Sequence, residues 1–200
     1  MNHSKQHLQE LSKVYQICVS GASRGHSAEE GRVLARAAGA AIARAGHTLM
    51  TGATIGIPNE AAIGYKKAGG KMSQGISPAS TKIEHAIKYR LPLKDYDSIV
   101  YTGLHYVSRD TLLITSSDAV ISIGGRIGTL HEFTIALETE TPVGLLQGAG
   151  GISTEIAEIL HAAGRSKSEL IIMSADPDDL IEKMTKLLDK LHKPYKELYE

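Results

Sequence analysis

The sequence predicts an α/β fold with a doubly wound, mainly parallel sheet that carries helices on both faces. Short apolar segments alternate with helix-like segments along the whole chain, which is the pattern of a parallel sheet built from strand–helix–strand units. One junction, residues 117–132, has the pattern of a buried strand, a tight glycine turn and the start of a helix. Glycine-rich turns follow at least four of the apolar segments, with the sequences SGASRG, TGATIG, IGGRIGT and QGAGG. In such a sheet these turns lie beyond the carboxyl ends of the strands, where ligands bind, so all four could converge on one crevice.

The strands are predicted from short apolar runs that are bounded by small residues or proline. They are expected at residues 14–20, 47–51, 71–76, 98–102, 119–123, 143–146 and 169–173. The segment 81–96 is polar, charged and interrupted by Pro92, so we expect a surface excursion there.

The helices are predicted between these strands from capping residues and glycine stops. Ser27 and Glu30 have the spacing of a capping box and open a helix that stops at Gly46. Asp176 and Pro177 form an N-cap and first-turn pair for the last helix, which runs to about residue 191. The other helices are expected at residues 59–67, 108–116, 129–138 and 153–163.

Composition limits the classes of function and the environment of the protein. We expect one domain over residues 14–200 after a polar leader at residues 1–13, and this leader lacks the apolar core of a signal peptide. Lysine plus arginine and aspartate plus glutamate number 22 each, which argues against broad electrostatic capture of nucleic acid or membranes. The lone Cys18 has no intrachain disulfide partner, so the sequence favours a cytoplasmic protein.

The junction at residues 117–132 is predicted to be the centre of a ligand site. Its apolar strand runs into Gly124 and Gly125, and a helix that carries Thr129 and Glu132 follows. A strand end, a tight turn and a helix N-terminus direct unpaired backbone N–H groups and the positive end of a helix dipole at one point, which suits a phosphate. Glu132 lies one turn inside the helix and can face the same point, where it would meet a hydroxyl, a water or a developing cation.

Several alternatives are weighed against this interpretation. Short strand–helix connections often need glycine for no functional reason, Glu132 could be an ordinary surface residue, and Arg109 could be a solvated helix arginine. The first turn does not match the G-x-G-x-x-G fingerprint, and no G-x-x-x-x-G-K-[ST] sequence occurs, so NAD-dependent chemistry and P-loop hydrolysis are disfavoured. The nine histidines lack metal-ligand spacing, and we expect neither a metal nor a cofactor.

The motifs over about residues 14–160 resemble the LOG family. Its pattern is an arginine on a helix, then a strand, then P-G-G-x-G-T-x-x-E, and Arg109, the strand at 119–123, GGRIGT and Glu132 are similar to it. The family was long labelled possible lysine decarboxylases, and its characterised members are cytokinin riboside 5′-monophosphate phosphoribohydrolases. The resemblance implies a Rossmann-like fold, shared with the molybdenum-cofactor carrier proteins and the DNA-processing protein A domain.

The resemblance also assigns roles to residues. Arg109 and Glu132 fall on the family's catalytic arginine and glutamate, while Gly124 and Arg126 stand where the enzymes have proline and glycine. Asp110 stands where they usually have a basic residue. The residues expected to bind the phosphate or the nucleotide are Gly21, Ser23, Gly52, Thr54, Gly56, Gly124, Gly125, Arg126, Gly128 and Thr129.

Three functions follow as hypotheses. The first is hydrolysis of the N-glycosidic bond of a nucleoside 5′-monophosphate, which gives a free base and ribose 5-phosphate. The second is a non-catalytic carrier or sensor of a phosphate-bearing cofactor or nucleotide, because Arg126 could fill the sugar pocket or grip a second phosphate. Single-stranded DNA binding is the weakest, given the balanced charge and few aromatic residues. The resemblance also implies a homodimer, which the apolar helix at residues 33–45 supports loosely.

Overall fold

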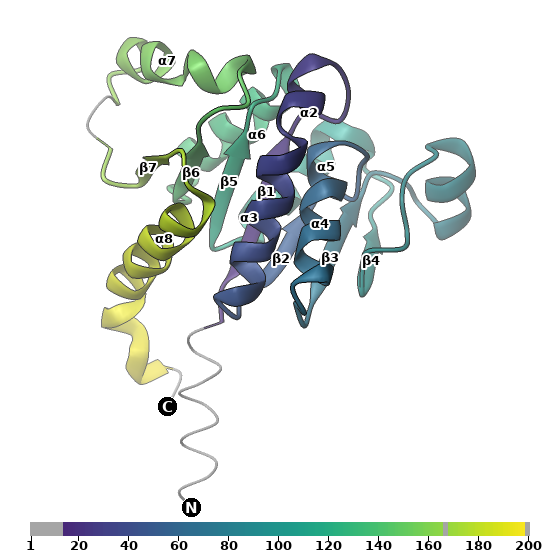
Figure 1. Ribbon diagram of the computed structural model, residues 1–200, viewed down its shortest axis with the longest axis horizontal. Coiled ribbons are helices and arrows are strands. Elements are labelled where there is room, and N and C mark those ends of the chain that lie inside the picture. The colour runs from purple at the N-terminus through teal and green to yellow at the C-terminus, as the bar shows by residue number, and fades with distance from the viewer. Residues whose placement is uncertain (1–13, 166–167, 199–200) are drawn as a thin grey trace, which may run out of the picture.

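The computed structural model describes residues 14–165 and 168–198 and contains a seven-stranded sheet in which all neighbouring strands are parallel (Figure 1). The predicted leader at residues 1–13 lies outside the described residues. The strand order is β4-β3-β2-β1-β5-β6-β7. The strands are β1 (Gln16–Gly21), β2 (Thr48–Thr51), β3 (Ser73–Ser77), β4 (Ser98–Tyr101), β5 (Ala119–Ile123), β6 (Val143–Leu146) and β7 (Ile171–Ser174). The predicted α/β fold with a parallel sheet is confirmed, and the ends of the predicted strands differ from the observed ends by at most two residues.

Helices cover both faces of this sheet. One face packs against α3, α4 and α8, and the other packs against α5, α6 and α7 (Figure 1). The helices are α2 (His26–Glu30), α3 (Arg32–Arg44), α4 (Ile57–Lys67), α5 (His105–Thr115), α6 (Ile127–Glu138), α7 (Ile156–Ala162) and α8 (Pro177–His192). Short helical turns are the π-helical η1 (Glu84–Lys88) and the 3₁₀ turns η2 (Gly151–Thr154) and η3 (Lys193–Leu198). No helix within the two described ranges has the length and apolar character needed to cross a membrane.

Several helix starts differ from the prediction: α4 and α6 begin two residues earlier than expected, α7 begins three residues later, and the starts of α2 and α5 differ for identifiable reasons. The capping box is wrong, because Ser27 is buried inside α2, which begins after Gly25, and Gly31 separates α2 from α3. Helix α5 begins at His105, three residues before the predicted start, so Arg109 lies in its second turn. Its N-cap is Leu104, whose side chain cannot cap a helix and therefore left no signal in the sequence. By contrast, Asp176 caps α8 as predicted and accepts a hydrogen bond from the backbone N–H of Asp179 at 2.8 Å.

Helices α3 and α4 approach each other more closely than a side chain at Gly39 or Gly64 would allow. A methyl group on Gly39 would overlap the backbone carbonyl of Ala61, and one on Gly64 would overlap the carbonyl of Arg36. Glycine at both positions therefore lets the two backbones touch. This contact places the N-terminus of α4, and the loop before it, beside the loop that follows β1, where Gly56 faces the carbonyl of Ser23.

Replacing Gly39 by alanine is expected to destabilise the protein by about 1–3 kcal/mol, because the new methyl group meets backbone that cannot move without shifting α4. The same change in a helix interior ordinarily stabilises by about 0.5–1 kcal/mol. Gly128→Ala is the control, since a methyl group on Gly128 has no atom within 4 Å. Urea unfolding of both variants measures the difference, and a Gly39→Ala variant as stable as the parent would contradict the close packing.

Candidate functional site

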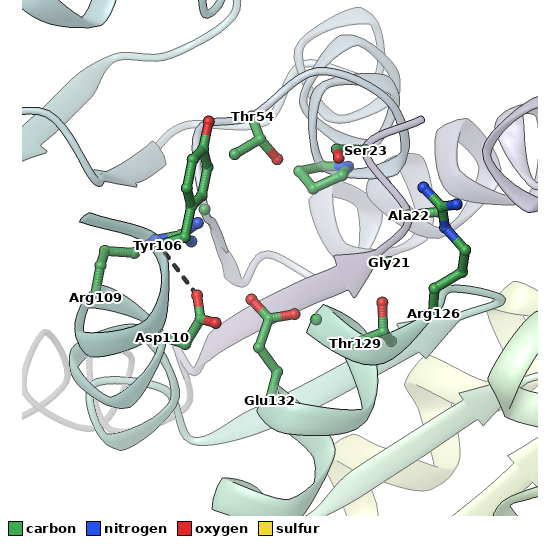
Figure 2. A pocket seen from close by; sticks show the side chains of 13 residues that line it. Gly21, Ala22, Ser23, Thr54, Tyr106, Arg109, Asp110, Arg126, Thr129 and Glu132 are labelled. Carbon is green, nitrogen blue, oxygen red and sulfur yellow. Dashed lines mark ion pairs between the residues drawn. The ribbon is translucent and has the colours of Figure 1, made fainter. Parts of the chain in front are cut away.

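A cavity of about 240 Å³ opens beyond the carboxyl ends of β1, β2 and β5 (Figure 2). The two strands β1 and β5 are neighbours, and the chain continues from them to opposite sides of the sheet, so the cavity lies where the strand order reverses. Nine of the residues predicted from the sequence line it: Gly21, Ser23, Gly52, Thr54, Arg109, Arg126, Gly128, Thr129 and Glu132. The cavity also includes Ala22, Pro58, Tyr106 and Asp110, which the prediction did not assign.

Three of the four glycine-rich turns border the cavity, and the fourth supports one of them from behind. Gly151, in the turn after β6, packs against the backbone of Gly125, and the N–H of Ile152 donates to the carbonyl of Gly125 at 2.9 Å. The expectation that four turns could converge on one crevice is thus corrected to three. The turn after β6 belongs to the neighbouring strand and braces the turn after β5.

Three predicted glycines shape the loops without lining the cavity. Gly124 and Gly125 have positive φ angles of 56° and 93°, which glycine adopts without strain. A side chain on Gly125 would also overlap that of Thr129, so this glycine lets the first turn of α6 fold back onto the turn. Gly56 has φ 76° and borders a second hollow of about 290 Å³ on the far side of the loop after β1.

The N-terminus of α6 is open toward the cavity. Its N-cap residue, Arg126, is extended and makes no side-chain capping bond, and the backbone N–H of Leu130 is the first that donates within the helix, to Arg126 at 2.9 Å. The N–H groups of residues 127–129 therefore have no acceptor inside the helix. Two of these residues, Gly128 and Thr129, line the cavity, which makes this end of it suitable for an anion.

Glu132 lies in the middle of the cavity, one turn further along α6 (Figure 2). The hydroxyl of Ser20, at the end of β1, donates a hydrogen bond to Oε2 of Glu132. Burial raises the pKa of Glu132 to about 7, and the negative charge of Asp110 adds to this effect. Arg109 and the Ser20 hydroxyl act in the opposite direction. Near neutral pH the carboxyl group can therefore both hold and release a proton.

Arg109 enters the cavity wall from α5 beneath the loop after β2. The residue is only 3 % exposed, and its guanidinium packs against Gly52, where a methyl group would overlap Nη1. Its Nε lies 3.5 Å from Oδ1 of Asp110, and neither Nε nor Nη1 has a hydrogen-bond partner within the described part of the chain. A buried, incompletely paired guanidinium is unusual, because such groups are normally satisfied by protein or ligand acceptors.

Asp110 and Tyr106 are the functional candidates that the sequence prediction did not assign. Oδ2 of Asp110 lies 3.1 Å from Nδ1 of His131 on α6, and burial raises the pKa of Asp110 against the opposing effects of Arg109 and His131. Tyr106 lies one helical turn before Arg109 on α5 and lines the cavity beside Arg109. Its spacing of three residues from Arg109 would have indicated it, had the start of α5 been known.

Arg126 lies along the edge of the cavity. Its guanidinium carbon would be 3.7 Å from a methyl group built on Gly25, and Figure 2 shows the side chain reaching past Ala22 rather than across Glu132. The same view separates the cavity into two ends, with Arg109 and Tyr106 on one side of Glu132 and Thr129 and Arg126 on the other. The expectation that Arg126 could fill the sugar pocket does not fit this arrangement, whereas its place at the edge leaves it free to contact a phosphate.

A sequence model described as the SLOG cluster4 family matches residues 14–181. The chain belongs to the SLOG cluster4 family. The SLOG superfamily includes the LOG-like proteins, so the resemblance seen in the motifs is confirmed at the level of the superfamily. This SLOG chain is also 34% identical over 127 residues to an uncharacterized protein of Archaeoglobus fulgidus, an alignment that covers 63% of this chain and 76% of that protein.

Solved structures similar to this SLOG chain include molybdenum-cofactor proteins. The Moco carrier protein from Chlamydomonas reinhardtii is 28% identical with a TM-score of 0.73, and the match covers 88% of this chain and 99% of that one. The molybdenum cofactor binding protein from Rippkaea orientalis is 26% identical with a TM-score of 0.69, covering 88% and 98%. DNA processing protein A from Helicobacter pylori, at 18% identity, a TM-score of 0.54 and coverage of 88% and 83%, shares the fold.

Glu132→Gln is expected to stabilise the protein at pH 8 by up to about 3 kcal/mol. The pKa of Glu132 is about 7 in the folded state, above its ordinary value of 4.5. Ionisation of this group in the unfolded chain therefore destabilises the fold progressively between about pH 4.5 and pH 7, and the full effect is present above pH 7. Below about pH 4.5 the carboxyl group is protonated in both states and the advantage disappears. Glu138→Gln, at the exposed end of α6, is the control. Urea unfolding at pH 4.5 and pH 8 measures the effect, and an equal difference at both pH values would contradict it.

Proposed function

We propose that this protein binds a nucleoside 5′-monophosphate and hydrolyses its N-glycosidic bond to a free base and ribose 5-phosphate. The observation that carries the proposal is the position of Glu132, a half-buried carboxyl group with a pKa of about 7, between an open helix N-terminus and the buried Arg109. An anion site, a titrating carboxyl group and a cation then lie in one cavity, in an order that matches the phosphate, the sugar and the base of a nucleotide.

The two ends of the cavity suggest how the nucleotide lies. The 5′-phosphate would accept hydrogen bonds from the N–H groups at the start of α6 and from the Thr129 hydroxyl, with Arg126 beside it. The ribose would then lie over Glu132, and the base would lie against Tyr106 and Arg109. This orientation keeps the phosphate away from the carboxylates and holds C1′ near Glu132.

The chemistry is a displacement at C1′. The bond from C1′ to the base nitrogen breaks with its electron pair leaving to the base, and the ribose gains oxocarbenium character that ionised Glu132 stabilises. A water molecule forms the new C1′–O bond and gives its proton to Glu132. The proton then passes through solvent to the departing base, which leaves as the neutral base and restores the Glu132 carboxylate, while Arg109 donates a hydrogen bond to the base as it departs. Ionised Glu132 is required, so the rate should rise with pH through about 7.

Base release from a panel of purine and pyrimidine nucleoside 5′-monophosphates tests this proposal by chromatography. The parent protein is expected to release base from at least one of them, and Glu132→Gln is expected to lose at least about a hundred-fold in rate while it still binds that nucleotide. Glu138→Gln on the same helix serves as the matched control and should keep the parental rate. Base release by Glu132→Gln at the parental rate would remove Glu132 from the mechanism.

A carrier or sensor of a phosphate-bearing cofactor or nucleotide is the second candidate. The likeness to the molybdenum-cofactor proteins over 88% of this chain favours it, as does the exposed guanidinium of Arg126 beside the loop after β1. A carrier would bind its ligand without turnover, so thermal stabilisation by molybdopterin or a nucleotide, together with no base release from any monophosphate, would replace the enzyme proposal with this one.

A homodimer also remains a prediction, and the exposed apolar side chains on α5 support it. Val107 is 67% exposed, and Leu112 on the same helix and Leu104, its N-cap residue, are exposed too. Val107→Glu is therefore expected to convert a dimer into a monomer in light scattering, because a charge in an apolar interface is poorly solvated. Val33→Glu, on the exposed side of α3, is the comparison. A dimer unaffected by Val107→Glu but lost in Val33→Glu would assign the interface to α3.

A further inference from the structure

Two carboxyl groups from different helices face the same part of the cavity. Asp110 on α5 and Glu132 on α6 both line it, and Figure 2 shows both side chains directed into the space between the two ends. Asp110 is 7 % exposed, so its charge is almost completely removed from water. Asp110 also joins α5 to α6 through His131, but Glu132 makes no contact of that kind, since its hydrogen-bond partner is Ser20 on β1.

Both carboxyl groups have acceptor capacity to spare. An ionised carboxylate offers about four acceptor sites. Asp110 has one close donor, Nδ1 of His131 at 3.1 Å, and a distant one, Nε of Arg109 at 3.5 Å. Glu132 accepts from the hydroxyl of Ser20. A bound ligand could therefore donate hydrogen bonds to both acids at once, and His131 would hold the carboxylate of Asp110 in place from the opposite side.

The charge of these groups decides which part of a ligand lies over them. A phosphate would be repelled by two carboxylates at such close range and is favoured instead at the open N-terminus of α6. The two acids also interact, since Asp110 contributes to the raised pKa of Glu132. The ligand group above them must therefore carry no negative charge and must donate hydrogen bonds. Hydroxyl groups on neighbouring carbons of a sugar ring meet this requirement, with one donor for each acid.

We propose that Asp110, held by His131, binds the 2,3-diol of a phosphorylated ribofuranose together with Glu132 and makes the site selective for ribose over 2-deoxyribose phosphates. The inference deepens the proposed function and rests on it, because it assumes that the phosphate lies at α6 and the sugar over Glu132. It assigns Asp110 to substrate selectivity, a role that is separable from the bond cleavage assigned to Glu132.

Ribose 5-phosphate and 2-deoxyribose 5-phosphate test the inference, since both carry the phosphate and neither carries a bond to be cleaved. In isothermal titration calorimetry at pH 8, the parent protein is expected to bind ribose 5-phosphate about ten- to a hundred-fold more tightly, the effect of one hydrogen bond to a charged group. Asp110→Ala is expected to lower the affinity for ribose 5-phosphate to that for the deoxy sugar and to leave the deoxy affinity unchanged or improved. Asp110→Asn should give an intermediate preference, and Glu158→Ala, exposed on α7, is the control.

The outcomes separate this inference from the proposed function. Equal affinities of the parent protein for the two sugars would overturn the diol inference and leave the phosphate site intact. An equal loss of both affinities in Asp110→Ala would show a merely structural role for Asp110 and would also overturn it. If the parent protein bound neither sugar phosphate, the proposed function itself would fail. The comparison of the two sugars on the parent protein needs no variant, so it stands even if Asp110→Ala does not fold.

Discussion

The parallel pairing of β1 with β5 positions the groups of the cavity. In this register Ser20 is opposite Ser122 and Gly21 is opposite Ile123, so both strands end at the same level. The chain leaves β1 toward α2 and leaves β5 toward α6, and the two loops part to open the crevice. Because Ser20 is the last side chain of β1 before the turn, it meets Glu132 on the first turns of α6. A shift of one residue in this register would point Ser20 to the other face of the sheet.

The electrostatics of the cavity follow from this arrangement. One end combines an uncapped helix N-terminus with Arg126. The middle holds the half-buried Glu132 and the buried Asp110, and the other end holds the buried guanidinium of Arg109. Placing ionisable groups in such a poorly hydrated place opposes folding, and burial is the largest cause of the raised pKa of both Glu132 and Asp110. The fold tolerates this because the apolar clusters on the two faces of the sheet stabilise it independently. Ionisable groups that are held in a cavity at a cost in folding free energy are typical of catalytic and binding sites.

Much of the fold could be predicted from the sequence because its signals are local. The apolar run at residues 119–123, the two glycines that follow and the cap at Asp176 all specify structure through their immediate neighbours. The start of α5 could not be predicted, because Leu104 offers no cap and His105 adopts a positive φ of 57°. The supporting role of the turn at Gly151 could not be predicted either, since it depends on contact with Gly125 from the neighbouring strand.

Some residues of the candidate site could be predicted from the sequence and others could not, because only some of their positions depend on local signals. The glycine turn and Glu132 are close in sequence, and their geometry follows from one strand, one turn and one helix. Asp110 and Tyr106 come into the cavity only through the packing of α5 against α6, which periodicity does not describe. Likewise, the direction of Arg126 along the edge of the cavity depends on the open space beside Gly25, a residue 101 positions earlier in the chain.

In the proposed complex, a phosphate at the start of α6 holds a sugar over Glu132. A crystal structure of the protein soaked with ribose 5-phosphate tests it most directly. We expect the phosphate oxygens to accept hydrogen bonds from the N–H groups of Gly128 and Thr129, with C1 of the sugar beside the Glu132 carboxylate. A phosphate bound against Arg109 and Tyr106, with the sugar directed away from Glu132, would contradict the account.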